Sequence, residues 1–229
     1  MPINAQKTAI VTGAARGIGL ATSKLFLEIG WRVTMVDRDA EELHTASAEL
    51  DGVIALPLDI TSPENAQAMV ADTMSAFGRI DALVNNAGVA DFSPIEDTTF
   101  ERWREVMATN LDGIFLCVQA AIPALKVTQG AIVNIGSISG LRASTLRVAY
   151  GTSKAAVIHL TQQQAAELGE FGVRVNCVAP GPVRTKLAAA VHTQDIINAY
   201  HDAIPLNRYG TEEEIAHVIV FLCSPEASY

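Results

Sequence analysis

The regular alternation of short apolar segments with longer segments of helical periodicity constrains the fold of this chain more than any other feature. Six short segments rich in branched apolar residues are predicted as strands: residues 9–11, 32–36, 53–58, 82–85, 131–135 and 174–178. A strand, a helix and a second strand in succession form a parallel unit with a right-handed crossover. The sequence therefore predicts an α/β fold, a doubly wound parallel sheet between two layers of helices.

Composition indicates a single domain over residues 1–229. The chain is 49% hydrophobic and 18% charged, so it can bury a sizeable core without disulfides. Its three cysteines, Cys117, Cys177 and Cys223, lie in apolar contexts without Cys-x-x-Cys spacing, which favours buried thiols in a reducing compartment. The five histidines show no convincing metal-ligand spacing, so we expect no catalytic metal.

Charge and hydropathy make two classes of partner unexpected. The net charge is −9 and the sixteen basic residues are dispersed, which argues against a nucleic-acid-binding face. No uninterrupted apolar run approaches the roughly 20 residues that span a bilayer, and the first residues form no apolar signal core. We therefore expect a cytoplasmic protein that binds neither nucleic acid nor membrane.

A glycine-rich turn follows the first predicted strand and precedes a helical pattern. Its sequence is Gly13-Ala-Ala-Arg-Gly17-Ile-Gly19, which differs from the general Gly-x-Gly-x-x-Gly fingerprint. Glycines permit a tight turn, and the N-terminus of the following helix offers free N–H groups to a pyrophosphate. Asp37 ends the next strand, where an acidic side chain can bind ribose hydroxyls. This arrangement predicts binding of a nicotinamide dinucleotide.

Tyr150 and Lys154 are four residues apart and would share one face of a helix, with Ser137 thirteen residues upstream. A free phenol titrates near about 10, and an adjacent fixed positive charge would lower its pKa. Such a tyrosine can accept a proton from an alcohol. In isolation, the pair more often means a half-buried ring beside a solvated amine.

The motifs taken together resemble the short-chain dehydrogenase/reductase family over nearly the whole chain. They are Thr12-Gly13-x-x-x-Gly17-x-Gly19, Asn85-Asn86-Ala87-Gly88, Asn110, Ser137, Tyr150-x-x-x-Lys154 and Pro180-Gly181. The resemblance implies a Rossmann-type fold and hydride transfer between a secondary alcohol or ketone and a nicotinamide dinucleotide. It also implies a homo-oligomer, a tetramer or a dimer, that acts on a small molecule.

The resemblance also assigns catalytic roles. Ser137 would hold the reacting oxygen, and Tyr150 would act as general acid/base. Lys154 would lower the pKa of Tyr150 and bond the nicotinamide ribose, and Asn110 would hold a water that relays protons to solvent. Without its partners, Asn110 would be interpreted as a residue that bends or caps a helix.

The cofactor site implied by the resemblance comprises Gly13, Arg16, Gly17, Ile18, Gly19, Asp37, Asp59, Ile60, Asn86, Ala87, Gly88, Tyr150, Lys154, Pro180, Val183 and Thr185. The less favoured alternative for Asp59 is a cap at the start of a helix, and Asn85 is expected to hold neighbouring backbone. Asp37 favours NAD, because its carboxylate would repel a 2′-phosphate. Arg16 and Arg38 lie where basic residues accompany NADP use in the family, so NADP is the less favoured cofactor.

Two other functions remain open: an NADPH-preferring carbonyl or 3-oxoacyl reductase, and a dinucleotide-binding regulatory protein without turnover. Substrate identity is expected to depend on a cover segment at about residues 186–204. Arg142 and Arg147 could each bind a substrate carboxylate or lie on the surface. The chain stops after a predicted helix at residues 212–222, before the last strand of the family, and that strand is expected to be absent either from the protein or only from the sequence printed above.

Overall fold

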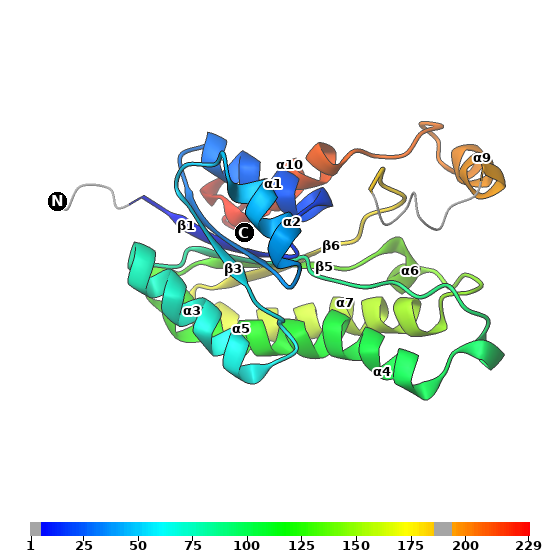
Figure 1. The fold of residues 1–229 in the computed structure, drawn as a ribbon, viewed down its shortest axis with the longest axis horizontal. Helices are drawn as coiled ribbons and strands as arrows, with labels where there is room; N and C mark the ends of the chain where they lie inside the picture. Colours follow the sequence, from blue (N-terminus) through cyan, green and yellow to red (C-terminus); the bar gives the residue numbers. More distant parts are fainter. Residues whose placement is uncertain (1–5, 186–193) are drawn as a thin grey trace.

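The computed structural model describes residues 6–185 and 194–229 and contains one six-stranded parallel sheet (Figure 1). The strand order is β3-β2-β1-β4-β5-β6. The strands are β1 Thr8–Thr12, β2 Arg32–Asp37, β3 Val53–Pro57, β4 Ala82–Asn85, β5 Ala131–Ile135 and β6 Arg174–Val178. The six predicted strands are confirmed, each boundary to within one residue.

Helices cover both faces of the sheet, which confirms the three-layer prediction (Figure 1). One face carries α1 Gly17–Glu28, α2 Ala40–Ser47 and α10 Glu212–Cys223, and the other carries α3 Pro63–Phe77, α5 Gly113–Thr128 and α7 Val148–Leu168. Shorter elements connect them: η1 Ile95–Asp97, α4 Phe100–Met107, η2 Ala108–Asp112, α6 Ile138–Leu141, η3 Gly169–Phe171, α9 Gln194–Ala203 and η4 Pro225–Ala227.

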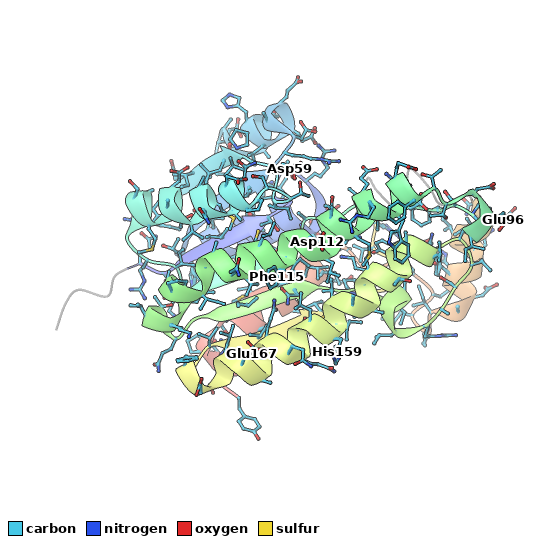
Figure 2. The ribbon with its side chains drawn as sticks, turned by 90° about the horizontal axis from the view of Figure 1, so that it is seen from below. Asp59, Glu96, Asp112, Phe115, His159 and Glu167 are labelled. Carbon is cyan, nitrogen blue, oxygen red and sulfur yellow. The ribbon has the colours of Figure 1, made fainter. Side chains whose placement is uncertain are left out.

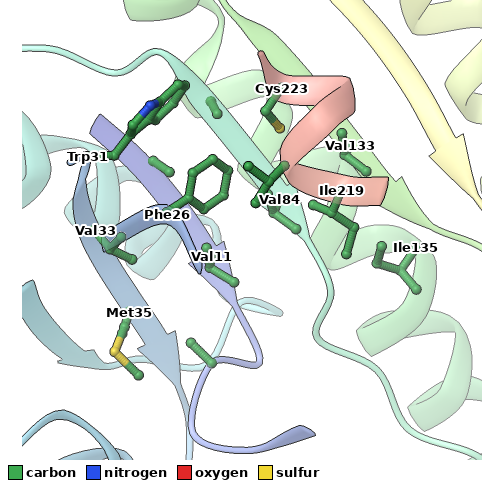
Figure 3. Close-up of a cluster of buried hydrophobic side chains, with 14 of the residues drawn as sticks. Val11, Phe26, Trp31, Val33, Met35, Val84, Val133, Ile135, Ile219 and Cys223 are labelled. Atoms are coloured by element: carbon green, nitrogen blue, oxygen red, sulfur yellow. The ribbon is translucent and has the colours of Figure 1, made fainter. Parts of the chain in front are cut away.

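The sheet separates two apolar clusters, because its central strands are buried on both faces. Figure 3 shows the cluster below α1 and α10, where Val11, Phe26 and Ile219 meet. The rings of Phe26 and Trp31 pack there with centroids 4.9 Å apart. The second cluster joins the opposite face of the sheet to α3, α5 and α7. This double burial explains why the strands are almost uninterrupted apolar runs in the sequence.

Local sequence signals fix where the helices begin. The Ser62 hydroxyl accepts a hydrogen bond from Asn65 N at 3.2 Å, and Pro63 is the first residue of α3. Thr211 and Glu214 form a reciprocal capping box at the start of α10. These caps set the first residues of α3 and α10.

One continuous helical stretch, Phe100–Thr128, is long and apolar enough to cross a membrane by length and composition alone. The sequence analysis does not single it out. Within it, Ile114, Cys117 and Leu125 of α5 are fully buried in the second apolar cluster. Core helices of soluble proteins pass the same test, so the stretch is weak support for a membrane span.

Candidate active site

A cavity of about 610 Å³ opens at the carboxyl ends of the strands. Loops after all six strands contribute to its wall, and the strand order reverses between β1 and β4, where ligands of such sheets bind. The residues that represent the six loops are Gly13, Asp37, Asp59, Gly88, Ser137 and Pro180. Every catalytic or cofactor residue predicted from the sequence lines this cavity except Gly19 and Asn110.

The glycine turn after β1 is tightly packed against its neighbours. Gly13 and Gly17 have positive φ of 64° and 61°. A Cβ on Gly19 would lie 2.1 Å from the Gly13 carbonyl oxygen, so only glycine lets α1 start this close to the turn. The helix begins without a side-chain cap or an acidic residue in its first turn. Its N-terminal N–H groups are thus suited to a pyrophosphate.

Asn86 holds the glycine turn in place. Its Nδ2 donates to the carbonyl oxygens of Thr12 and Gly13, both at 3.0 Å. The Thr12 hydroxyl accepts in return from Asn86 N and Ala87 N. The prediction that Asn85 holds neighbouring backbone is wrong, because its Nδ2 donates to Asn134 Oδ1 inside the core. Asn86, the first residue after β4, therefore both lines the cavity and holds the glycine turn, whereas Asn85 ends the strand and is buried.

The carboxylate of Asp37 faces the cavity at the end of β2. One oxygen accepts from Ala15 N at 3.2 Å and the other from Asp39 N at 3.1 Å. Arg16, on the opposite side of the glycine turn, is ion-paired with Asp39 and lies 3.9 Å from Glu42. The Arg16 guanidinium, which could neutralise a 2′-phosphate, therefore already lies beside two carboxylates.

The loop after β3 supplies Asp59 and Ile60. Asp59 Oδ1 accepts from both the backbone N and the hydroxyl of Thr61 at 2.9 Å, which shapes the approach to α3. Asp59 does not cap the helix, because Ser62 does. Ile60 is buried against Gly113. Asp59 therefore has a structural role as well as a place in the cavity wall.

Ser137 and Tyr150 meet at the opposite end of the cavity from Asp37. Ser137 follows β5, and its Oγ accepts from Ser139 N at 3.1 Å while its hydroxyl hydrogen-bonds Tyr150. Burial raises the pKa of the Tyr150 phenol, and the hydrogen bond from Ser137 and the positive charge of Arg147 oppose that rise only in part. The phenol therefore retains its proton at neutral pH in this state of the site.

Lys154 lies one turn further along α7 and is 4% exposed. Its Nζ donates to the Ile135 carbonyl oxygen at 2.7 Å and lies 5.9 Å from the centre of the Tyr150 ring. Burial lowers its pKa to about 8. The sequence analysis expects Lys154 to lower the pKa of Tyr150. In the structure Arg147 is the cation with that effect, and the pKa is raised overall.

Asn110 lies in η2, a one-turn π-helix between α4 and α5 of a kind often found at functional sites. Its Oδ1 accepts from Val89 N at 2.8 Å, and its Nδ2 donates to Val89 O and to the Ser153 hydroxyl. Its side chain therefore holds the loop after β4 against α7. A Cβ on Gly88 would lie 3.2 Å from that Oδ1 and 3.5 Å from Lys154 Nζ. The water relay assigned to Asn110 stays a prediction.

The loop after β6 closes the wall with Pro180, Val183 and Thr185, and Val183 forms a parallel bridge with Gly210. Of the predicted cover segment, residues 186–193 lie outside the described residues, and the remainder, residues 194–204, contains the whole of α9. Tyr200 of α9 lines the cavity, as does Phe92 in the loop after β4. The sequence analysis missed both, because a lone aromatic carries no positional signal.

A family model described as Enoyl-(Acyl carrier protein) reductase matches residues 13–229. This chain belongs to the short-chain dehydrogenase/reductase family. The match includes the glycine turn, Ser137, Tyr150 and Lys154.

Known members of the family resemble the chain over most of its length. An L-fucose dehydrogenase of Oryctolagus cuniculus is 37% identical, with 98% of this chain and 81% of that protein covered. A trans-4-hydroxycyclohexanecarboxylate dehydrogenase of Sinomonas cyclohexanicum is 34% identical, with 98% and 88% covered. The crystal structure of a 3-ketoacyl-(acyl-carrier-protein) reductase of Brucella melitensis, complexed with NADH, superposes with a TM-score of 0.92 at 30% identity and covers 97% and 92%.

Membership makes this chain a nicotinamide-dinucleotide-dependent oxidoreductase that acts on the CH–OH group of a small molecule. The residues present fit such a cofactor: the glycine turn admits a close approach, and no side chain caps α1. Among the residues that the structure describes, no group of three or more His, Cys, Asp or Glu could hold a metal ion.

Proposed function

We propose that this member of the family uses NAD(H) and interconverts a secondary alcohol and a ketone, with Tyr150 as general acid/base. The observation that carries the proposal is the hydrogen-bonded pair of Ser137 and Tyr150, which faces one end of the cavity while Asp37 faces the other. A dinucleotide that spans this cavity would bring its hydride-transferring ring to the two hydroxyls.

The preference for NAD rests on Asp37. Two backbone N–H groups fix its carboxylate, and a 2′-phosphate about 4 Å away would be repelled by roughly 4 kcal/mol at intermediate dielectric. Asp39 and Glu42 already engage Arg16, as described above. Arg38 also lines the cavity, and it would bind the 2′-phosphate if the enzyme preferred NADP.

In the proposed reaction the cofactor supplies or accepts the hydride. Ser137 holds the reacting oxygen beside the Tyr150 hydroxyl, and Tyr150 gives a proton to that oxygen in reduction or takes one in oxidation. The raised pKa of Tyr150 favours its protonated form, which suits the reductive direction at neutral pH. Lys154 Nζ and Asn110 Oδ1 both lie close to Gly88. The proposed relay of protons from Tyr150 toward solvent would pass along these two side chains.

Two alternatives are kept. A 3-oxoacyl reductase is supported by the structural likeness to the Brucella melitensis 3-ketoacyl reductase, and a preference for NADPH is supported by Arg38 in the cavity wall. A binding protein without turnover would need the same cofactor site. Cytoplasmic location and a cover segment at residues 186–204 within one catalytic domain also stay predictions, as does the absence of a last strand.

The test is hydride transfer itself. The protein is incubated with NAD or NADP and a panel of secondary alcohols, and with NADH or NADPH and the matching ketones, and absorbance is followed at the wavelength of the reduced cofactor. NAD(H) is expected to support turnover. Asp37→Asn is expected to raise the NADP/NAD ratio of kcat/KM by roughly 10- to 100-fold, because the repelling charge is lost.

Tyr150→Phe removes only the hydroxyl, so turnover is expected to fall at least about 100-fold while NADH still binds. Tyr209→Phe is the matched control, because Tyr209 is buried outside the cavity wall. Turnover retained in Tyr150→Phe would refute the proposed acid/base. Tight NADH binding without turnover on any alcohol or ketone would favour the binding protein.

A further inference from the structure

Arg147 lies in the cavity wall directly before α7, three residues from Tyr150. We propose that its guanidinium binds a carboxylate of the substrate, so that the enzyme acts on a hydroxy acid and the corresponding oxo acid. This inference rests on the proposed function, because it concerns the substrate of the same site.

The guanidinium is held in place without being neutralised. Its central carbon lies 3.9 Å from the centre of the Phe92 ring, and both residues line the cavity. The side chain is only partly exposed, and it forms no hydrogen bond or ion pair with any residue that the structure describes. The segments outside the described residues, 1–5 and 186–193, contain no Asp or Glu. This chain therefore offers Arg147 no carboxylate there either.

The charges around the cavity are separated into two ends. The acidic residues of its wall are Asp37, Asp39 and Asp59, and all of them follow β2 or β3. The end that holds Ser137, Tyr150 and Tyr200 has no acidic residue in the described wall. A partly buried arginine in this environment is costly unless an anion pairs with it. The planar guanidinium suits a carboxylate, which it can bind with two parallel hydrogen bonds.

The proximity of Arg147 to Tyr150 limits the size of the substrate. Arg147 is the residue before α7, Tyr150 lies in the first turn of that helix, and the Arg147 charge acts on the Tyr150 phenol. An oxygen bound at Tyr150 and a carboxylate bound at Arg147 can therefore belong to one small molecule. The carboxylate is expected within a few carbon atoms of the carbinol carbon.

Arg142 is the matched comparison. The sequence analysis treated both arginines alike, but Arg142 is exposed at the end of α6 and does not line the cavity. Neither residue donates a side-chain hydrogen bond that caps a helix. Substituting either one by methionine therefore removes a charge without removing a helix cap.

The experiment compares acids with their neutral esters. The wild type, Arg147→Met, Arg147→Lys and Arg142→Met are assayed with NAD on 2-, 3- and 4-hydroxypentanoate and on the three methyl esters. The wild type is expected to prefer at least one acid over its ester by 10-fold or more in kcat/KM. Arg147→Met should lower kcat/KM for that acid roughly 10- to 100-fold more than for its ester, because any change with the ester reports only the loss of the positive charge near Tyr150. Arg147→Lys should fall between, and Arg142→Met should match the wild type.

Two results would overturn the proposal while the proposed function stands: a wild type that uses esters as well as acids, or an Arg147→Met enzyme that loses acid and ester activity equally. If no alcohol is turned over, the proposed function fails, and the subsite is judged by calorimetry with pentanoate and the NADH-loaded protein. Binding that Arg147→Met removes then supports the subsite, and absence of binding to the wild type overturns it.

Discussion

Lys154 carries a titratable charge at a position that is 4% exposed, and within the described residues its one side-chain hydrogen bond is to a backbone carbonyl. Such a site penalises the ammonium, which is why burial lowers its pKa to about 8. A lysine retained at this cost is expected to serve function rather than stability. The same residue therefore gives a measurable pH dependence of folding.

The stability cost of Lys154 should appear as a pH-dependent difference between the wild type and Lys154→Met. The unfolded lysine binds its proton up to about pH 10.5, whereas the folded one releases it near pH 8. Between these values the unfolded state binds more protons, so the stability of the wild type rises with pH. We expect its free energy of unfolding, relative to the variant, to rise by about 3 kcal/mol across this window.

Denaturant unfolding of both proteins without cofactor, at several pH values, checks this expectation. Lys24→Met is the control, because Lys24 is exposed on α1 and should give a difference that is independent of pH. If the difference in free energy of unfolding between the wild type and Lys154→Met does not change with pH, the folded lysine titrates like an exposed one.

At the scale of elements, the cofactor end of the cavity depends on how closely α1 approaches β1. Gly19 sets that distance, because its α-carbon faces the carbonyl oxygen of Gly13. The helix is held from its other side by α10, which begins at its own capping box and contributes Ile219 to the shared apolar cluster. A change at Gly19 must therefore move the turn or the helix.

Gly19→Ala should destabilise the protein by about 1–3 kcal/mol, as overpacking does, and weaken NADH binding at least about 10-fold. Gly169→Ala is the matched control: it has nothing within 4 Å of an added Cβ and an ordinary φ of −59°, so it should be neutral or slightly stabilising. Chemical denaturation and a fluorescence titration with NADH measure both effects. Unchanged NADH affinity in Gly19→Ala would contradict the role given to this contact.

At the scale of the whole molecule, the outer face of α5 and α7 is the candidate surface for self-association. Figure 2 shows Asp112 at the end of η2 and Phe115 of α5 on the same face as His159 and Glu167 of α7. The Phe115 side chain is 50% exposed. Aromatic residues are enriched in protein interfaces relative to the rest of the surface.

We propose that copies of this chain associate through this face into a dimer or tetramer. Phe115→Asp should shift the molar mass measured by light scattering toward the monomer, because a charge in the centre of an interface is costly. Ile29→Asp is the control, an equally exposed apolar residue at the end of α1. A wild type that is monomeric at micromolar concentration would refute the proposal.

The sequence by itself determined the fold and the chemical class, because these depend on local signals. Each strand is a short apolar run, and a crossover between parallel strands is right-handed. The glycine turn can be recognised from the spacing of its glycines. That Tyr150 and Lys154 share one face of a helix follows from helical spacing alone. These signals depend only on residues that are close together in the sequence, so they do not require tertiary contacts.

Only the tertiary structure decided which of two similar residues faces the cavity. Asn86 rather than Asn85 holds the glycine turn, and Arg147 rather than Arg142 lines the site. The direction of the Tyr150 pKa likewise depends on burial beside Ser137 and Arg147. Burial and the charge of groups distant in sequence are properties of packing, which no local pattern records.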